Sequence, residues 1–384
     1  MVEIIRSAGL YAEVMTKFEL ELALFAGYSG KEIIVNEPCK PLSFLQSCFD
    51  SMVRFIVIDS LQELADIDRI AVSREKGMNI VLRVNPDYVP SGMNYGSATG
   101  SRRGSAFGLD LKGGEVKAAL DRLRGNPRLN FQGFHFHIGT GIRSPKDYAH
   151  ALRILPILIS EANATGFKIR ILDVGGGFAS PTTREFTNSE MLFYQGFRKL
   201  PKFNSEDTGT SYEDFTKEIS HAVQKYFSLN ELPELIFEPG RCITSPNQFL
   251  LLTVHRIKER NGIGKWLITD GGLGTVTLPT YYEYHEVFLC NDVLRHRDEN
   301  VDIIGPACFA GDIVYRNKPM PKISTGEVIA IMDSGAYFTQ LESSFGFPRP
   351  AIVAVRQNGH QLIRARETFE TMVQRDIITN HNKG

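Results

Sequence analysis

Two hydrophobic patterns divide this chain near residue 240. Before that point, short β-branched apolar runs alternate with longer segments in which apolar residues recur at helical spacing, as Leu61, Leu64 and Ala65 do. Such alternation of strand and helix is typical of a parallel sheet covered by helices. The runs predicted to be strands are 10–14, 32–36, 54–59, 79–85, 133–139, 168–175 and 234–240.

After Arg241 the pattern changes to strand-like runs separated by Gly, Pro, Asn and Asp, without long helical patterns. The residues at 357–360, Gln-Asn-Gly-His, are typical of a hairpin turn. We therefore predict a second, all-β domain, with the two domains at 1–243 and 244–384. The segments 91–108 and 182–211 are polar or rich in Gly and Ser, and we expect both to be loops.

Composition narrows the function only mildly. The chain has 384 residues, 42% hydrophobic and 23% charged, which is ordinary for a globular protein with room for two domains. Its net charge of −1 argues against a general nucleic-acid or anionic-membrane surface. No apolar run reaches the roughly 18 residues of a membrane span, and no signal-peptide pattern opens the chain, so we expect a cytoplasmic location. Five scattered cysteines without a C-x-x-C pair indicate neither a disulfide framework nor structural zinc.

The run GFHFHIGTG at 133–141 is the most suggestive motif. His135 and His137 are two residues apart, so they project to the same side of a strand. A metal site would need a third ligand that no spacing supplies, while buried core histidines and a ligand-binding strand end both remain open. Further along, the glycines at 175–177 follow a strand and would leave backbone N–H groups unobstructed for a phosphate. They do not form a dinucleotide fingerprint, because Ser180 stands where its last glycine should be.

Five motifs in a fixed order, 133–141, 172–178, 237–241, 305–312 and 333–337, together resemble a known enzyme family. The chain resembles the pyridoxal-phosphate-dependent ornithine, diaminopimelate and arginine decarboxylases, which have the fold type III, alanine-racemase-like barrel. The resemblance implies a (βα)8-type TIM barrel that binds pyridoxal 5'-phosphate, followed by the all-β domain. It also implies decarboxylation of an amino acid or modified amino acid, by a homodimer with shared active sites.

The resemblance assigns roles to individual residues. His137 matches the histidine that stacks on the cofactor ring, and Glu238 matches the glutamate that pairs with the protonated pyridine nitrogen. Cys308 matches the catalytic cysteine that enters the partner subunit's site and protonates the decarboxylated product. Glu13 and Arg83 match an acid and an arginine that pair beneath the cofactor. The other implied cofactor-binding residues are Thr140, Gly175, Gly176, Gly177, Gly240, Arg241 and Tyr337, and the implied substrate-binding residues are Tyr281, Tyr282 and Asp312.

Two departures from the family stand out. The family carries its cofactor lysine on the first barrel strand, in a Tyr-x-x-Lys-x-Asn motif, and the chain opens at Met1 on a segment that resembles the following helix. We therefore expect the first strand to be missing and no covalent bond between the cofactor and a lysine of this chain. Leu278 and Phe309 stand where diaminopimelate decarboxylases carry an arginine and a glutamate. The substrate side chain is therefore expected to be less polar, larger, or positioned by Tyr281, Tyr282 or Glu283.

Three functions follow from these patterns. The first is a pyridoxal-phosphate-dependent decarboxylase, whose lysine strand precedes this chain. The second is an inactive, lysine-less relative that binds a phosphate ligand or a partner subunit. The third is an amino-acid racemase of the same barrel type, which the cysteine at 308 disfavours. The sequence does not specify the amino acid.

Overall fold

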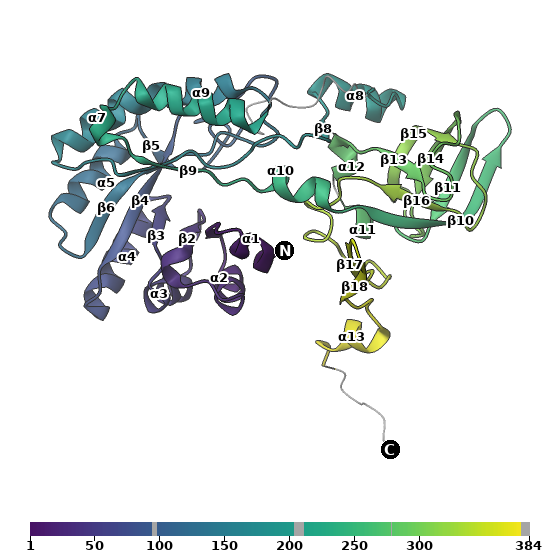
Figure 1. The fold of residues 1–384 in the computed structure, drawn as a ribbon, viewed down its shortest axis with the longest axis horizontal. Helices are drawn as coiled ribbons and strands as arrows, with labels where there is room; N and C mark the ends of the chain where they lie inside the picture. Colours follow the sequence, from purple (N-terminus) through teal and green to yellow (C-terminus); the bar gives the residue numbers. More distant parts are fainter. Residues whose placement is uncertain (94–97, 203–210, 278, 378–384) are drawn as a thin grey trace, which may run out of the picture. The chain divides into compact units, whose positions relative to one another are not determined.

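The computed structural model describes residues 1–93, 98–202, 211–277 and 279–377 (Figure 1). The chain forms two compact units. The first comprises Met1–Ala179 with Gly209–Gly240, and the second comprises Ser180–Thr208 with Arg241–Gly384. The segment 180–208 thus belongs with the C-terminal part of the chain, although it lies between two strands of the first unit in the sequence. A division into domains at residue 243 stays a prediction.

The first unit is built on a parallel sheet in which strand order follows chain order. Its strands are β1 (Ala12–Val14), β2 (Ile33–Asn36), β3 (Phe55–Ile58), β4 (Met78–Asn85), β6 (Leu129–His135), β7 (Ile171–Asp173) and β9 (Glu234–Ile236), and the short β5 (Leu109–Asp110) pairs with β4. Each of the seven predicted runs overlaps one of these strands, although the run predicted at 133–139 is displaced, because β6 ends at His135. Within the described residues β1 and β9 are the end strands, so the expected first barrel strand is not part of this sheet.

Helices connect the strands of the first unit. They are α1 (Val2–Ser7), α2 (Lys17–Phe25), α3 (Leu42–Ser51), α4 (Leu61–Arg74), α5 (Glu115–Arg124), α6 (Pro145–Ala151), α7 (Leu155–Ala164) and α9 (Tyr212–Gln224), with short 3-10 turns at Gly30–Glu32, Leu152–Ile154 and Leu229–Glu231. Helix α4 shows why these segments are helical. The Ser60 side chain caps it by accepting from the Glu63 N–H, and Leu64, Ile67 and Ile70 recur at helical spacing and are buried.

The strands between β1 and β9 are mostly buried on both faces, as parallel strands usually are, whereas these two end strands are partly exposed. One face holds a cluster of Ile34, Phe55, Val57, Val81 and Ile171, and the other carries the helices. Because strand order follows chain order, every crossover places its helix on the same face, as in a barrel. The carboxyl ends of the strands therefore meet at one edge, where a barrel carries its functional residues.

The second unit is mostly β. Its main sheet contains β10 (Leu250–Arg260), β11 (Gly264–Thr269), β13 (Val287–Leu289), β14 (Arg297–Ile304), β15 (Ile313–Pro321) and β16 (Val328–Ile331), in the order β13-β16-β10-β11-β14-β15. Two small sheets pair β8 (Arg184–Glu185) with β12 (Glu283–Tyr284) and β17 (Ile352–Arg356) with β18 (Gly359–Arg364). The β17–β18 hairpin confirms the turn predicted at 357–360. The short helices are α8 (Asn188–Phe197), α10 (Arg241–Thr244), α11 (Leu273–Val276), α12 (Pro279–Tyr282) and α13 (Phe369–Val373), with a 3-10 turn at Ser245–Asn247.

The predicted fold class, a barrel-type α/β sheet followed by a β domain, is confirmed in outline. One local expectation is wrong, because the segment 182–211 is not simply a loop. It contains β8 and α8, and α8 starts at a capping box in which Thr187 and Glu190 satisfy each other's backbone N–H groups. No helix in the described ranges is long and apolar enough to cross a membrane.

Candidate active site

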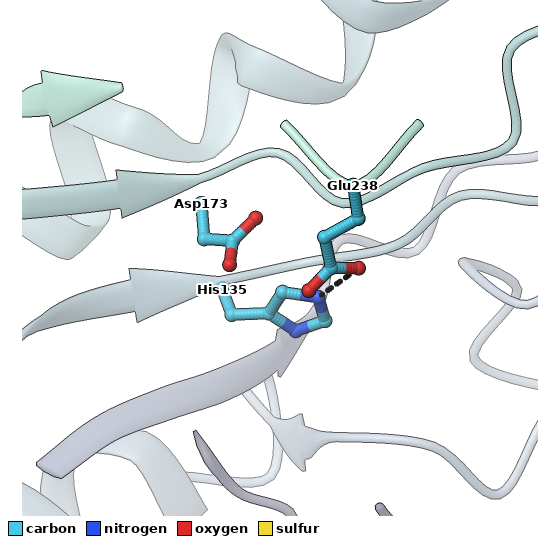
Figure 2. Close-up of side chains that lie close together, drawn as sticks. All are labelled: His135, Asp173 and Glu238. Atoms are coloured by element: carbon cyan, nitrogen blue, oxygen red, sulfur yellow. Dashed lines mark ion pairs between the residues drawn. The ribbon is translucent and has the colours of Figure 1, made fainter. Parts of the chain in front are cut away.

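Three polar side chains, two of them buried and the third 12% exposed, converge at the carboxyl ends of the parallel strands (Figure 2). His135 is the last residue of β6, Asp173 is the last residue of β7, and the two are register partners. Glu238 follows two residues after the end of β9. Ligand atoms of these three side chains all lie within 4.8 Å of one another.

Asn36, at the end of β2, links two members of this cluster. Its Nδ2 donates a hydrogen bond to Glu238 Oε1 at 3.2 Å and lies 3.3 Å from His135 Nε2. His135 Nε2 is in turn 3.7 Å from Glu238 Oε2. Burial lowers the pKa of His135 to about 4, so the ring is neutral at physiological pH. A neutral ring that accepts at Nε2 carries its proton on Nδ1.

Burial raises the pKa of both carboxyl groups in this cluster. The pKa of Asp173 rises to about 7, through burial first and the Glu238 charge second. The pKa of Glu238 also rises through burial, but the Arg83 guanidinium and a hydrogen bond from Asn36 oppose the rise. Because Arg83 already supplies a positive charge to these carboxylates, we assign no metal ion to the cluster.

Arg83 is not paired as the family resemblance implies. Its guanidinium forms an ion pair with Asp59, at 3.5 Å, and lies over the Phe107 ring at 4.6 Å from its centroid. The expected ion pair between Glu13 and Arg83 does not form. Glu13 lies on the end strand β1, where its side chain is exposed.

The glycine turn after β7 is packed too tightly for side chains. A Cβ on Gly176 would lie 2.3 Å from the Glu238 carbonyl oxygen, and one on Gly177 would lie 2.0 Å from the Gly139 carbonyl oxygen. Gly175 and Gly177 also have left-handed φ values of +69° and +91°, which glycine adopts without strain. The turn therefore needs glycines for packing as well as for ligand access.

Two N–H groups of this turn already have partners. Gly175 N–H donates to Asp173 Oδ1 at 2.9 Å, and Gly176 N–H donates to His137 Nδ1 at 3.1 Å. The expectation that all three N–H groups are open is therefore wrong, because neighbouring side chains fold back onto two of them. Gly177 N–H makes no hydrogen bond to the described residues, so it is the donor of this turn that is open to a ligand.

His137 lies two residues beyond the end of β6, not within the strand as predicted. Because its Nδ1 accepts from the glycine turn, the ring is held in place. Burial lowers its pKa to about 3, so it is neutral. Thr140 follows in the turn at 139–141, half-buried, and its hydroxyl makes no hydrogen bond to the described residues.

In the second unit Arg241 is engaged by acidic residues. Its guanidinium forms ion pairs with Glu283 and, at 3.6 Å, with Glu185, and its Cζ lies 4.5 Å from the centroid of the Tyr337 ring. Glu283 also lies 3.1 Å from His285 Nε2. The Arg241 side chain is thus occupied within the unit, which leaves its backbone as the group that could meet a phosphate.

Two of the expected substrate-binding residues, Asp312 and Tyr281, form hydrogen bonds with backbone groups of the loop that carries Cys308. The Asp312 carboxylate accepts from Leu273 N–H at 2.6 Å and from Ala307 N–H at 2.8 Å. The Tyr281 hydroxyl donates to the Gly311 carbonyl at 3.0 Å. Cys308 itself is exposed and free. Direct contact of Asp312, Tyr281 or Tyr282 with a substrate stays a prediction.

A pocket of about 220 Å³ lies beside this loop, and it is mainly apolar. Its apolar walls include Leu273, Pro306, Ala307, Phe309, Phe345 and Phe347. The Phe309 and Phe345 rings are 6.4 Å apart between centroids. Leu278, the other departure from the family pattern, lies outside the described residues.

Comparison with known proteins agrees with this geometry. The family model described as "Pyridoxal-dependent decarboxylase, pyridoxal binding domain" matches residues 1–245. The chain belongs to this family. A diaminopimelate decarboxylase of Methanothermobacter thermautotrophicus is 31% identical over 381 residues, 97% of this chain and 81% of that protein. One from Methanocaldococcus jannaschii is 28% identical over 375 residues, 97% of this chain and 80% of that protein.

Solved structures give the same result. The crystal structure of the M. jannaschii diaminopimelate decarboxylase superimposes with a TM-score of 0.86 at 27% identity, covering 99% of this chain and 82% of that one. A complex of the same enzyme with L-lysine has a TM-score of 0.86 at 26% identity and the same coverage. These relatives carry the name of amino-acid decarboxylases, and they support neither the racemase nor the inactive alternative.

The cofactor of this decarboxylase family is pyridoxal phosphate, and the strand ends of the first unit fit it. Three buried polar atoms there, Asn36 Oδ1, His135 Nδ1 and Asp173 Oδ2, have no hydrogen-bond partner among the described residues. Buried polar atoms normally have one, so this arrangement is that of a binding site. Glu238 would meet the ring nitrogen, His137 the ring face, and Gly177 N–H the phosphate.

Lys40 is a lysine whose charge reaches His135 of this decarboxylase site, and it is not free to bond the cofactor. Its ammonium donates to the carbonyl groups of Glu37 and Val57 and to Glu63 Oε1, the last at 2.6 Å. An ammonium group has three protons, and all three are used. Its side chain is fully buried.

Sequence reasoning missed several residues of the site. It assigned no role to Asn36, Asp59 or Asp173, and it left His135 open between a core histidine and part of a ligand-binding strand end. A signal existed, because each is a polar residue at or just after the end of a buried strand run. Polar residues at carboxyl ends of parallel strands converge at one edge of the sheet.

Proposed function

We propose that this protein removes the α-carboxylate of a free amino acid as CO2, with pyridoxal phosphate bound at the strand ends of the first unit. The observation that carries the proposal is Glu238. It is a carboxylate, 12% exposed, that accepts a hydrogen bond from Asn36 beside a glycine turn with an open N–H group. A neutral ligand would not need such a group, whereas a protonated pyridine nitrogen would.

The protein's own groups then have distinct tasks. When bound, pyridoxal phosphate supplies an electron sink for the electron pair left at the α-carbon as CO2 departs. Glu238 holds a proton on the ring nitrogen, because an opposite charge within hydrogen-bonding distance favours the protonated form. His137 offers a flat, neutral face and does not compete for that proton.

We further propose that Cys308 of a second copy returns a proton to the product carbon. Its thiol is exposed, and Asp312 and Tyr281 hold its loop by contacts to backbone groups. A positioned thiol is a competent general acid. The site is then complete in a dimer.

The substrate we propose has an apolar or amine-ended side chain, without a distal carboxylate. Relatives are named diaminopimelate decarboxylase, and solved structures of two such enzymes hold L-lysine. The pocket beside Cys308 has Asp270 and Asp312 as its charged lining residues, and no cation lines it in the described ranges. A distal carboxylate would therefore meet no opposite charge there.

The test is CO2 release from a panel of free amino acids, with the protein as its gene encodes it and with pyridoxal phosphate. Glu238→Gln should lower kcat/KM by about 10²-fold or more, because it removes the charge that faces the ring nitrogen. Glu234→Gln, at the start of β9 in a pair with Arg54 where the Glu234 side chain is 50% exposed, is the matched control and should stay near wild type. No CO2 from any amino acid, or an unaffected Glu238→Gln enzyme, would refute the proposal. Diaminopimelate as the preferred substrate would refute only the substrate class.

A further inference from the structure

Asp173 is a completely buried carboxyl group whose two oxygens have different surroundings. Oδ1 accepts the N–H of Gly175 at 2.9 Å, so it anchors the glycine turn. Oδ2 is buried and has no hydrogen-bond partner among the described residues. An ionised carboxylate with one bare oxygen in such a place is strongly disfavoured.

The charges around Asp173 make its ionised form less favourable still. The Glu238 charge opposes ionisation of Asp173, and Asp59 forms an ion pair with Arg83. The cations are few. His135 is neutral and Arg83 is shared with Asp59, while Lys40 is saturated by its own partners. Two neighbouring carboxyl groups in this setting tend to share one proton.

We propose that Asp173 carries a proton on Oδ2, donates it to the Glu238 carboxylate, and thereby acts as the positioning residue that keeps Glu238 ionised and correctly oriented. This proposal rests on the proposed function in one respect, the role of Glu238 at the ring nitrogen. One hydrogen bond satisfies the bare oxygen of Asp173 and removes the repulsion between the two acids. The same side chain then couples the glycine turn to the carboxylate that faces the cofactor ring (Figure 2).

The electrostatics agree with this direction of donation. Burial raises the pKa of Asp173 to about 7, with the Glu238 charge adding to it. Burial raises the pKa of Glu238 as well, but the Arg83 charge and hydrogen bonds from Asn36 and Asp173 oppose that rise. These contacts favour the proton on Asp173 and the negative charge on Glu238.

Asparagine is a direct mimic of a protonated aspartate at this position. Its Oδ1 can still accept from Gly175, and its Nδ2 can donate to Glu238 as the acid proton does. Leucine has a similar shape but loses both hydrogen bonds. Asp173→Asn should therefore recover what Asp173→Leu loses, which a purely space-filling role would not explain.

The first experiment needs no cofactor, so it is independent of the proposed function. The melting temperatures of wild type and Asp173→Asn are compared from pH 4.5 to 8.5. A carboxyl group whose pKa is raised in the native state contributes its full stabilisation of the fold below its unfolded pKa near 3.8. That contribution is lost as pH rises to about 7. As pH rises, Asp173→Asn should therefore become more stable relative to wild type, by up to tenfold in the folding constant per pH unit. This difference should level off above about pH 7.

A difference in melting temperature that stays constant across this range would overturn the proposal, because it would mean that Asp173 is ionised throughout. If Asp173→Leu does not fold, the Asp173→Asn comparison still decides. A second series in a Glu238→Gln background is the control. Removal of the neighbouring charge lowers the Asp173 pKa, so the rise should end at lower pH there. A rise that ended at the same pH in both backgrounds would also count against the proposal.

The second experiment uses pyridoxal phosphate labelled with ¹⁵N at the ring nitrogen. The ¹⁵N chemical shift should indicate a protonated nitrogen in wild type and Asp173→Asn, and partial loss of that proton in Asp173→Leu. Cofactor affinity should fall by about tenfold or more in Asp173→Leu and largely return in Asp173→Asn, as expected for a hydrogen bond to a charged group. Equal loss in both variants would overturn the proposal. An unprotonated nitrogen in wild type would instead refute the role assigned to Glu238.

Discussion

At the level of single residues, the first unit contains a buried ion pair between Lys40 and Glu63. Lys40 and Glu63 form an ion pair at 2.6 Å with almost no exposure to solvent. Such a pair is retained because removal of either partner leaves an uncompensated buried charge. Lys40 also donates to the carbonyl groups of Glu37 and Val57, so the pair connects the loop after β2 to β3 and α4. Its role is structural, although its charge reaches His135 in the cofactor site.

Lys40 should therefore form no covalent bond with pyridoxal phosphate. The chain is mixed with the cofactor, reduced with borohydride and digested, and the modified lysines are mapped by mass spectrometry. We expect no modified Lys40, because its nitrogen has no free electron pair while it donates three hydrogen bonds. The exposed Lys17 serves as a reference for nonspecific labelling. Modification confined to Lys40 would contradict this assignment.

Among the elements, two loops of the second unit are held together by one carboxylate, that of Asp312. Asp312 accepts N–H groups from Leu273 at the start of α11 and from Ala307 in the Cys308 loop. A Cβ on Gly272 or Gly305 would lie 2.1 to 2.2 Å from this carboxylate. Both glycines are thus needed so that the two loops can close around Asp312.

Asp312→Asn should destabilise the second unit. One of its two acceptor oxygens becomes an amide donor that faces a backbone N–H group, and a hydrogen bond to a charged group is worth about 1.5–3 kcal/mol. Urea unfolding should show a decrease of that size in the free energy of unfolding. Asp298→Asn, at an exposed position of β14, is the control and should change it by less than about 0.5 kcal/mol. An equal effect of both substitutions would contradict the role of Asp312.

For the whole molecule, the two units carry complementary groups. The first carries the ring-facing residues His137 and Glu238, and the second carries the exposed thiol of Cys308. The proposed homodimer would bring the thiol of one copy to the cofactor of the other. Closed two-fold dimers are the commonest homo-oligomers, and their contacts come in equal pairs.

Two inactive variants should therefore restore each other. Cys308→Ala and Glu238→Gln chains are unfolded together, refolded in equal amounts and assayed for CO2 release. A mixed dimer has one site with both defects and one with neither, so about a quarter of wild-type activity should return for random pairing. If mixed dimers form and no activity returns, the cysteine acts in its own subunit or outside catalysis.

The sequence by itself determined the strands of the first unit, the hairpin at 357–360 and the family. These features are local. Buried parallel strands are short β-branched runs, hairpin turns need particular residues, and Glu238 with the glycines at 175–177 forms motifs that can be recognised in the sequence.

Only the tertiary structure decided which polar groups form hydrogen bonds and ion pairs with one another. Asn36, His135 and Asp173 come from three different strands, and strand register sets the distances between them. Arg241 and Glu283 are 42 residues apart, and their pairing decides that the guanidinium is already occupied. Charge pairing in a buried site depends on distance and dielectric environment, and both arise only when the chain is folded.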